Sequence, residues 1–203
     1  MSGQALSRRD EYAMMTRQEV VKAARKLFAE HGYTQTTVEK IAREARVSPA
    51  TVYAQCRGKE GLLRTLMDIW TTSPTVERII IDSLAPPTGL AKLEVLADGY
   101  FDIRAEAGDI VRIVERAAAS SPATQEFLDI ANQRHIEALE TIVRGIAADG
   151  DLAEGLSIED TAKIIYFHFR IPQIDLAVEG FGWGVDRTKK WLFERVAAAI
   201  LKG

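Results

Sequence analysis

The sequence has few of the residues that stabilise small secreted proteins or carry metal and redox chemistry. Its single cysteine, Cys56, cannot form an internal disulfide, so a cytoplasmic location is expected. Its three histidines are far apart, and no Cys or His pair has metal-ligand spacing. Cys56 lies beside Arg57, but no general base accompanies it. We therefore expect no catalytic residues, no metal and no cofactor.

Long apolar runs are also missing. No stretch approaches the roughly 18 residues that a membrane-spanning helix needs, and the N-terminus lacks the apolar core of a secretory signal. Only six prolines occur in 203 residues, and there is no long alternation of Val, Ile and Thr. With 47% hydrophobic and 27% charged residues, the chain is predicted to be a globular, all-α protein.

The charge is divided unevenly along the chain. Residues 1–65 contain 12 Lys and Arg against 7 Asp and Glu, a net charge of +5. The remainder contains 14 against 22, a net charge of −8. A basic segment on an acidic body indicates that the N-terminal part meets a polyanion.

Helix signals divide the basic segment into short elements. After a disordered arm over residues 1–11, a helix is predicted from Tyr12 to Glu30, ended by a histidine and a glycine. Thr36 or Thr37 would cap the next helix, which runs to about residue 45. Ser48 and Pro49 then form a strong restart signal for a helix ending near residue 56. These elements define a predicted domain over residues 12–58, followed by a second over 59–203.

Two short helices joined by a tight turn predict a helix-turn-helix, whose second helix enters the major groove of DNA. Ala42 is small enough for the helix crossing, and Ile41 and Val52 would supply apolar contacts there. Such a pair also occurs in helical proteins of other functions. The charge division and the position near the N-terminus favour DNA binding over that alternative.

The residue types suggest how the second helix would read DNA. Gln55 suits an adenine edge, and Thr51 suits a thymine methyl group. Tyr53 and Thr37 suit phosphate oxygens, which position a protein without specifying sequence. Lys59 begins the next helix, where a cation and free backbone N–H groups attract phosphate. The complete predicted DNA-contact set is Thr37, Arg46, Ser48, Pro49, Ala50, Thr51, Tyr53, Ala54, Gln55 and Lys59.

The same segment resembles the DNA-binding domain of the Tet repressor (TetR) family. The resemblance is carried by LFAEHGYTQTTVEKIA at 27–42, VSPATVY at 47–53 and KEGLL at 59–63, and it covers roughly residues 15 to 66. It implies a homodimeric transcription regulator, usually a repressor. A three-helix DNA-binding domain would precede a six-helix domain that binds a small molecule and forms the dimer. It implies no enzymatic activity.

Two residues depart from the family pattern. Arg46 stands where the turn glycine is usual, and at positive φ it would cost about 1 kcal/mol. It would also add a cation to a surface that approaches phosphate. Cys56 stands where an aromatic residue usually closes the helix. The base preference of relatives therefore cannot be transferred to this helix.

The remaining chain is predicted to form longer amphipathic helices. Loop signals occur at residues 86–89, 106–108, 120–122, 148–151 and 181–184, and Pro172 should interrupt its helix. An apolar stripe on the final helix includes Trp191, Leu192 and Val196. Such a stripe is typical of a core, but the resemblance favours a homodimer through the last two helices.

An effector site needs an apolar cavity with a few placed polar groups. Aromatic wall residues favour an aromatic or hydrophobic effector. His168 is equally compatible with a core or interface histidine, and Arg104 fits an ion pair to an acidic neighbour better than an effector contact. The candidate effector residues are Tyr100, Arg104, His135, Tyr166, His168 and Arg170.

Three functions follow from these observations. The first is a dimeric repressor that a small molecule releases from a palindromic operator in double-stranded DNA. The second is a regulator without such an effector, controlled by a protein partner or by its abundance. The third is a helical enzyme carrying a DNA-binding segment, for which the sequence offers no catalytic constellation.

Overall fold

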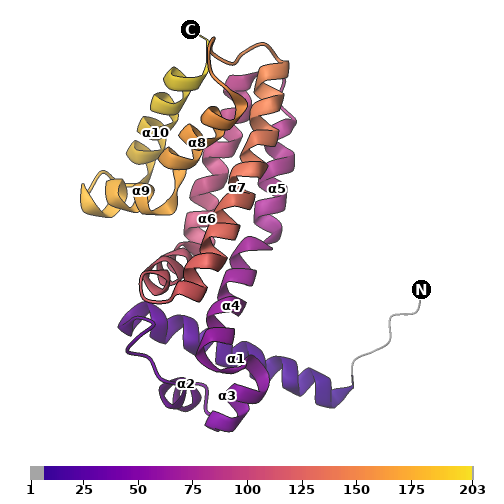
Figure 1. The fold of residues 1–203 in the computed structure, drawn as a ribbon, viewed down its shortest axis with the longest axis vertical. Helices are drawn as coiled ribbons and strands as arrows, with labels where there is room; N and C mark the ends of the chain where they lie inside the picture. The colour runs from indigo at the N-terminus through magenta and orange to yellow at the C-terminus, as the bar shows by residue number, and fades with distance from the viewer. Residues whose placement is uncertain (1–6, 203) are drawn as a thin grey trace. The chain divides into compact units, whose positions relative to one another are not determined.

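The computed structural model describes residues 7–202, and the regular structure of this part is helical apart from one isolated bridge between Leu152 and Leu201. The predicted all-α fold is thus confirmed (Figure 1). None of the helices in this range is long and apolar enough to cross a membrane. The helices are α1 (Arg8–His31), α2 (Val38–Glu44), α3 (Pro49–Cys56), α4 (Gly58–Thr71), α5 (Pro74–Leu84), α6 (Gly89–Ala118), α7 (Pro122–Ala148), α8 (Ile158–Phe169), α9 (Ile171–Asp175), the π-helix η1 (Leu176–Gly180) and α10 (Val185–Ile200).

The chain divides into two compact units, which differ from the predicted division at residue 58. One unit comprises the chain through Trp70 together with Asp109–Gln125, and the other comprises Thr71–Gly108 and everything from Glu126 onward. Helix α4, up to Trp70, therefore belongs to the same unit as α1, α2 and α3. Helices α6 and α7 each contribute residues to both units.

Helix α1 begins earlier than predicted, so residues 8–11 are not part of a disordered arm. Residues 1–6 of that predicted arm lie outside the described residues. The side chain of Ser7 accepts a hydrogen bond from the backbone N–H of Asp10 at 3.3 Å. Asp10 and Glu11 place negative charge in the first turn, where the helix dipole favours it. This N-terminal cap explains the early start.

Each of the helices α1 to α4 of the first unit has buried apolar residues. Phe28 of α1, Ile41 of α2, Val52 of α3 and Leu62 of α4 are all buried. Each such side chain contributes roughly 1.5–3 kcal/mol by leaving water. Figure 1 shows α2 and α3 side by side, and both contact α1. These contacts fix the orientation of α3.

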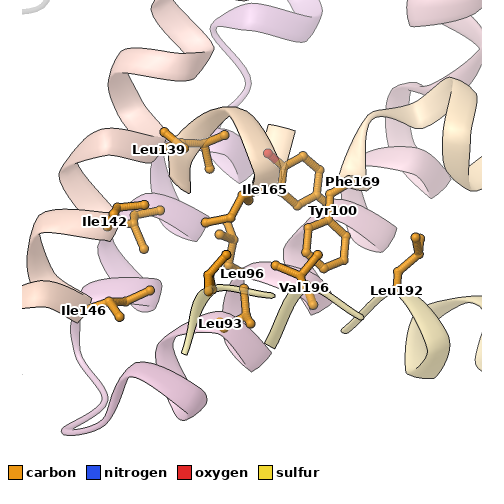
Figure 2. Packing of buried hydrophobic residues seen from close by; sticks show 14 of the residues in the cluster. Leu93, Leu96, Tyr100, Leu139, Ile142, Ile146, Ile165, Phe169, Leu192 and Val196 are labelled. Atoms are coloured by element: carbon orange, nitrogen blue, oxygen red, sulfur yellow. The ribbon is translucent and has the colours of Figure 1, made fainter. Parts of the chain in front are cut away.

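The second unit packs α5 to α8, α9 and α10 around one apolar cluster. Leu93 and Leu96 of α6 meet Leu139 and Ile142 of α7, and α10 adds its own apolar face (Figure 2). The α10 residues in this cluster are Leu192, Val196 and Ile200, so Leu192 and Val196 of the stripe predicted for dimer formation are core residues.

Of two predicted helix interruptions, the one at residues 106–108 is absent and the one at Pro172 is present. Residues 106–108 do not form a loop, because α6 continues through Gly108, which is buried. The cost of a helical glycine, about 1 kcal/mol, is small beside the packing of a 30-residue helix. The break at Pro172 is confirmed, since α8 ends at Phe169 and Arg170 is extended, with ψ 142°. Helix α9 restarts with Pro172 in its first turn.

Candidate functional site

Helix α3 presents one face to its own unit and the opposite face to solvent. Val52 and Cys56, one turn apart, are buried against the core. The outward face carries Pro49, Ala50, Tyr53 and Ala54, all of which are exposed. Apart from Tyr53, the side chains on this face are small and apolar, so the helix can approach another surface closely.

Ser48 fixes the start of α3. Its hydroxyl accepts from the backbone N–H of Thr51 at 3.1 Å and lies 2.9 Å from the Thr51 hydroxyl. Thr51 and Gln55 are half-buried, at the edge of the outward face. Gln55 also accepts, through its backbone carbonyl, a hydrogen bond from Arg17 of α1.

Arg17 is a positioning residue that the sequence reasoning missed. Its guanidinium bonds the Gln55 carbonyl at the end of α3 and the Thr65 hydroxyl of α4, the latter at 3.1 Å. One side chain therefore ties α1, α3 and α4 together. A sequence signal existed, because Arg17 lies three residues before the buried Val20 and so borders the packing face of α1.

The Tyr53 ring rests on Gly58, the first residue of α4. A Cβ at Gly58 would lie 2.8 Å from Cε1 of Tyr53, and Gly58 has φ +78°. Both facts require glycine at this position. The ring is 58% exposed, so its hydroxyl is held outward beside α3.

The turn between α2 and α3 is a Schellman motif with arginine in the left-handed position. Arg46 has φ +57°, its N–H donates to the Arg43 carbonyl, and the Val47 N–H donates to the Ala42 carbonyl. Arg46 thus adopts the left-handed conformation that a glycine would adopt with less strain. Its cost is about 1 kcal/mol relative to glycine. Arg57, directly after α3, also has φ +57°.

Lys59 and Thr37, both predicted DNA contacts, also have roles within the unit. The Lys59 ammonium donates to the Tyr33 carbonyl at 2.6 Å and lies 4.3 Å from the centre of the Tyr33 ring. Burial lowers the pKa of Lys59. Thr37 caps α2 by accepting from the Lys40 N–H. Thr36 is not the cap, because its buried hydroxyl donates to the Leu27 and Gly32 carbonyls.

Cys56 is a packing residue with no reactive environment. Its side chain is buried at the end of α3, and burial raises the pKa of the thiol. A raised pKa lowers the thiolate fraction, and with it the nucleophilicity. Within residues 7–202, no group of three or more His, Cys, Asp and Glu side chains could hold a metal ion.

Three of the predicted effector residues meet in the second unit. The Tyr100 hydroxyl lies 2.7 Å from Nε2 of His135, which packs edge-on against Tyr166 with ring centres 5.3 Å apart. Phe169 stacks on Tyr100 at 5.2 Å. Helices α6, α7 and α8 thus bring a small polar group into an aromatic setting.

The polar pair in this cluster is uncharged at neutral pH. Burial, helped by the positive charge of Arg170, lowers the pKa of His135 to about 4. Burial and the neighbouring Tyr166 raise the pKa of Tyr100. The 2.7 Å contact therefore fits a phenol that donates to a neutral imidazole.

Of the other three predicted effector residues, Arg104 and His168 have partners outside this cluster, and Arg170 borders it. Arg104 forms ion pairs with Asp175 at 2.7 Å and Glu179 at 2.8 Å, as the alternative reading of the sequence expected. His168 bonds the Ile164 carbonyl of its own helix through Nδ1. Arg170 lies over the Tyr166 ring at 5.2 Å, so it borders the aromatic cluster.

Helices α8 and α10 contact each other and retain apolar side chains on their outer faces. Phe167 of α8 is 62% exposed, and Trp191 of α10 is 42% exposed. Ala198 and Ala199, about two turns after Trp191, are exposed as well. Each of the two helices therefore leaves apolar side chains exposed that a second helical surface can cover.

Comparison with known proteins gives consistent matches. Residues 20–66 match the family model described as bacterial regulatory proteins, tetR family. The fatty acid metabolism regulator protein of Bacillus subtilis (strain 168) is 27% identical over 152 residues, covering 73% of this chain and 76% of the relative.

Solved structures share the fold. The complex of SmeT with triclosan has a TM-score of 0.76 at 19% identity and covers 93% of this chain and 92% of that one. NalD, the secondary repressor of the MexAB-OprM multidrug efflux pump in Pseudomonas aeruginosa, has a TM-score of 0.76 at 21% identity. It covers 95% of this chain and 98% of that one.

Proposed function

This chain belongs to the TetR family of bacterial transcriptional regulators, and from that premise we propose that it is a homodimeric repressor of a palindromic operator. A small hydrophobic or aromatic effector would release it from the DNA. Members of this family are not enzymes, and this chain is not one. A regulator of this kind works where the chromosome is, in the cytoplasm.

The observation that carries DNA binding is the outward face of α3. Pro49, Ala50, Tyr53 and Ala54 are exposed together, while Val52 and Cys56 anchor the helix from behind. An α-helix fits the major groove of B-DNA, which is roughly 12 Å wide. No charged side chain on this face would resist close approach to the bases.

Each contact residue has a role that follows from its chemistry. Ala50 and Thr51 would touch thymine methyl groups, and Gln55 would pair with an adenine edge. Tyr53, Thr37 and the hydroxyl of Ser48 would meet phosphate oxygens at the groove edges. Pro49 and Ala54 leave room for the backbone of α3 to approach.

The proposed dimer uses the exposed side of α8 and α10. Phe167 and Trp191 would lie at its centre, where aromatic residues contribute most to an interface. A two-fold axis there would give two copies of α3, which bind half-sites about one DNA turn, roughly 34 Å, apart. The operator would then be a palindrome.

The proposed effector site is the cluster of Tyr100, His135, Tyr166 and Phe169, with Arg170 at its border. Its side chains are aromatic, and its polar pair is neutral, which suits an apolar molecule with one hydrogen-bonding group. The names of similar proteins support this class: one is a fatty acid metabolism regulator, and another was solved in complex with triclosan.

A gel-shift titration with DNA flanking the protein's own gene, at low salt, tests DNA binding. We expect a retarded complex at micromolar protein or below, weakened by Tyr53→Ala, with Arg134→Ala of α7 as a control that leaves it unchanged. Unretarded DNA at every protein concentration would count against the proposed function.

A regulator without a small-molecule effector is the second candidate, because Tyr100 and His135 already satisfy each other. Native mass spectrometry of protein purified from cells separates the two candidates. A co-purified small molecule that Tyr100→Phe loses would support the effector. Protein that has only the mass of its own chain would favour control by a protein partner, provided that no small molecule tested releases the DNA complex.

A further inference from the structure

Two arginines flank α3, one directly after it and one three residues before its first residue. Arg46 precedes the helix and Arg57 follows it, and both have φ +57°. Within residues 7–202 they are the only non-glycine residues with positive φ. Both side chains are exposed. Glycine or asparagine would adopt this conformation with less strain, so the backbone does not explain arginine at either place.

Two nearby cations of the unit, Arg17 and Lys59, are already engaged, whereas Arg46 and Arg57 are not. Arg17 bonds Gln55 and Thr65, and Lys59 bonds the Tyr33 and Thr34 carbonyls. In the described part of the chain, neither Arg46 nor Arg57 has a hydrogen-bond or ion-pair partner for its guanidinium. Their charges are therefore available to a ligand.

The Glu44 carboxylate, which interacts electrostatically with Arg46, does not neutralise its charge. Glu44 influences Arg46 electrostatically, but its carboxylate bonds the Lys26 ammonium at 2.6 Å. Lys26 thus offsets the negative charge of Glu44. Both ends of α3 therefore keep a positive charge.

We propose that Arg57, together with Arg46, binds phosphodiester groups of double-stranded DNA and so holds α3 at both of its ends. This inference rests on the proposed DNA binding. Eight residues of α3 span about 12 Å, which is similar to the width of the major groove. Cations that lie just beyond the two ends of such a helix can reach the phosphates that border the groove.

Arg57 also takes the place that the sequence assigned to Lys59. The Lys59 ammonium is half-buried over the Tyr33 ring and donates to two backbone carbonyls. Binding a phosphate would require it to leave these partners. Arg57 lies at the same corner between α3 and α4 and has no partner to lose. A guanidinium can also bind phosphate through two hydrogen bonds.

Replacing Arg57 by glycine distinguishes an effect on DNA affinity from an effect on folding stability. Glycine accepts the left-handed conformation, so Arg57→Gly is expected to keep or raise the thermal midpoint of unfolding. The same change should lower DNA affinity about three- to tenfold and reduce the slope of log K against log salt by about one. A purely structural role for Arg57 would move stability and leave that slope unchanged.

The measurement is fluorescence anisotropy of a mixed-sequence DNA duplex over a range of salt concentrations. A phosphate contact carries no sequence information, so no operator is needed. Arg57→Lys should retain the wild-type slope, because it keeps the charge. Arg57→Asn should behave like Arg57→Gly, because it accepts the same backbone conformation without the charge. Arg134→Ala, which removes an exposed arginine of α7, should leave the slope unchanged.

The outcomes separate this inference from the function on which it rests. If the wild-type protein binds and Arg57→Gly keeps its salt slope, Arg57 does not contact phosphate and the inference is wrong. If Arg57→Lys reduces the slope of log K against log salt as much as Arg57→Gly does, the charge of Arg57 does not determine that slope, and the inference is equally overturned. If the wild-type protein binds no duplex at low salt, the proposed DNA binding itself fails.

Discussion

At the scale of single residues, glycine at position 58 determines where the Tyr53 ring lies. The ring occupies the space that a Cβ at Gly58 would fill, and the backbone there has φ +78°. Tyr53 is the largest exposed side chain on α3, so its position sets how closely the helix can approach DNA.

Gly58→Ala should lower DNA affinity through Tyr53 as well as lowering stability. We expect a loss of about 1–2 kcal/mol in the free energy of unfolding from the positive φ alone. Gly150→Ala is a matched control, since Gly150 has φ +81° and no heavy atom within 4 Å of an added Cβ. Urea denaturation should show a loss in both variants, whereas anisotropy should show weaker DNA binding in Gly58→Ala only. Equal DNA binding by both variants would mean that the Tyr53 ring is not held by Gly58.

His135 should make stability depend on pH. Folding lowers its pKa from 6.5 to about 4, so the unfolded chain takes up the proton first as the pH falls. The contribution of the neutral His135 to the free energy of unfolding is complete above pH 6.5 and declines between pH 6.5 and about 4. Below that range the total loss is at most about 3 kcal/mol.

Urea denaturation at several pH values between 7 and 4 measures this contribution. His135→Gln keeps hydrogen-bonding capacity without titrating in that range, so its stability should decline less than that of the wild type. The difference between the two curves isolates the histidine, because all other groups titrate in both proteins. Parallel curves would show that His135 has an ordinary pKa in the folded state.

The sequence predicted helix starts more reliably than it predicted which groups each side chain bonds. Ser48 and Pro49 begin α3 as expected, because capping acts between neighbours in the sequence. Lys59 was expected to be available to phosphate, but it bonds a carbonyl 26 residues away. Such partners depend on how α1 and α4 pack, which local sequence does not specify.

At the scale of helices, α5 and α6 approach closely at Gly99. A Cβ there would lie 2.6 Å from two carbons of the Ile79 side chain, which is itself buried. The predicted interruption of α6 at residues 106–108 was wrong, because the helix continues through the buried Gly108. A glycine in a long helix can serve close packing, and the sequence pattern does not separate that role from a loop.

Gly99→Ala should destabilise the protein, although alanine normally favours a helix by about 1 kcal/mol. The expected loss is about 1–3 kcal/mol, because the added methyl group overpacks the Ile79 site. Ile79→Ala alone should cost about 2–5 kcal/mol by leaving a cavity. Thermal unfolding of the double variant should show a smaller loss than the sum. Strictly additive losses would exclude contact between the two positions.

At the scale of the whole molecule, the exposed apolar side of α8 and α10 is the proposed dimer surface. Phe167 is 62% exposed, and Ile81 of α5 is a matched control with 60% exposure. The sequence predicted these helices but also assigned Leu192 and Val196 to the interface, and both are core residues. Helical periodicity shows an apolar stripe without showing which neighbour covers it.

Phe167→Glu combined with Trp191→Glu should convert the dimer to a monomer, because two buried carboxylates per subunit would oppose association. Sedimentation equilibrium measures the mass directly, and Ile81→Glu should remain dimeric. Loss of the second half-site should weaken binding to a palindrome by about 100-fold or more. A monomeric wild type, or dissociation by Ile81→Glu alone, would place the interface elsewhere or remove it.

Selection of binding sites from a random pool of duplex DNA tests the central claim most directly. It makes no assumption about which gene the protein controls. We predict enrichment of a palindrome whose half-sites are separated by about one helical turn, bound by two protomers and lost from the pool with Tyr53→Ala protein. A pool that stays random, or enriches sequences without two-fold symmetry, would contradict a dimer that reads DNA through α3.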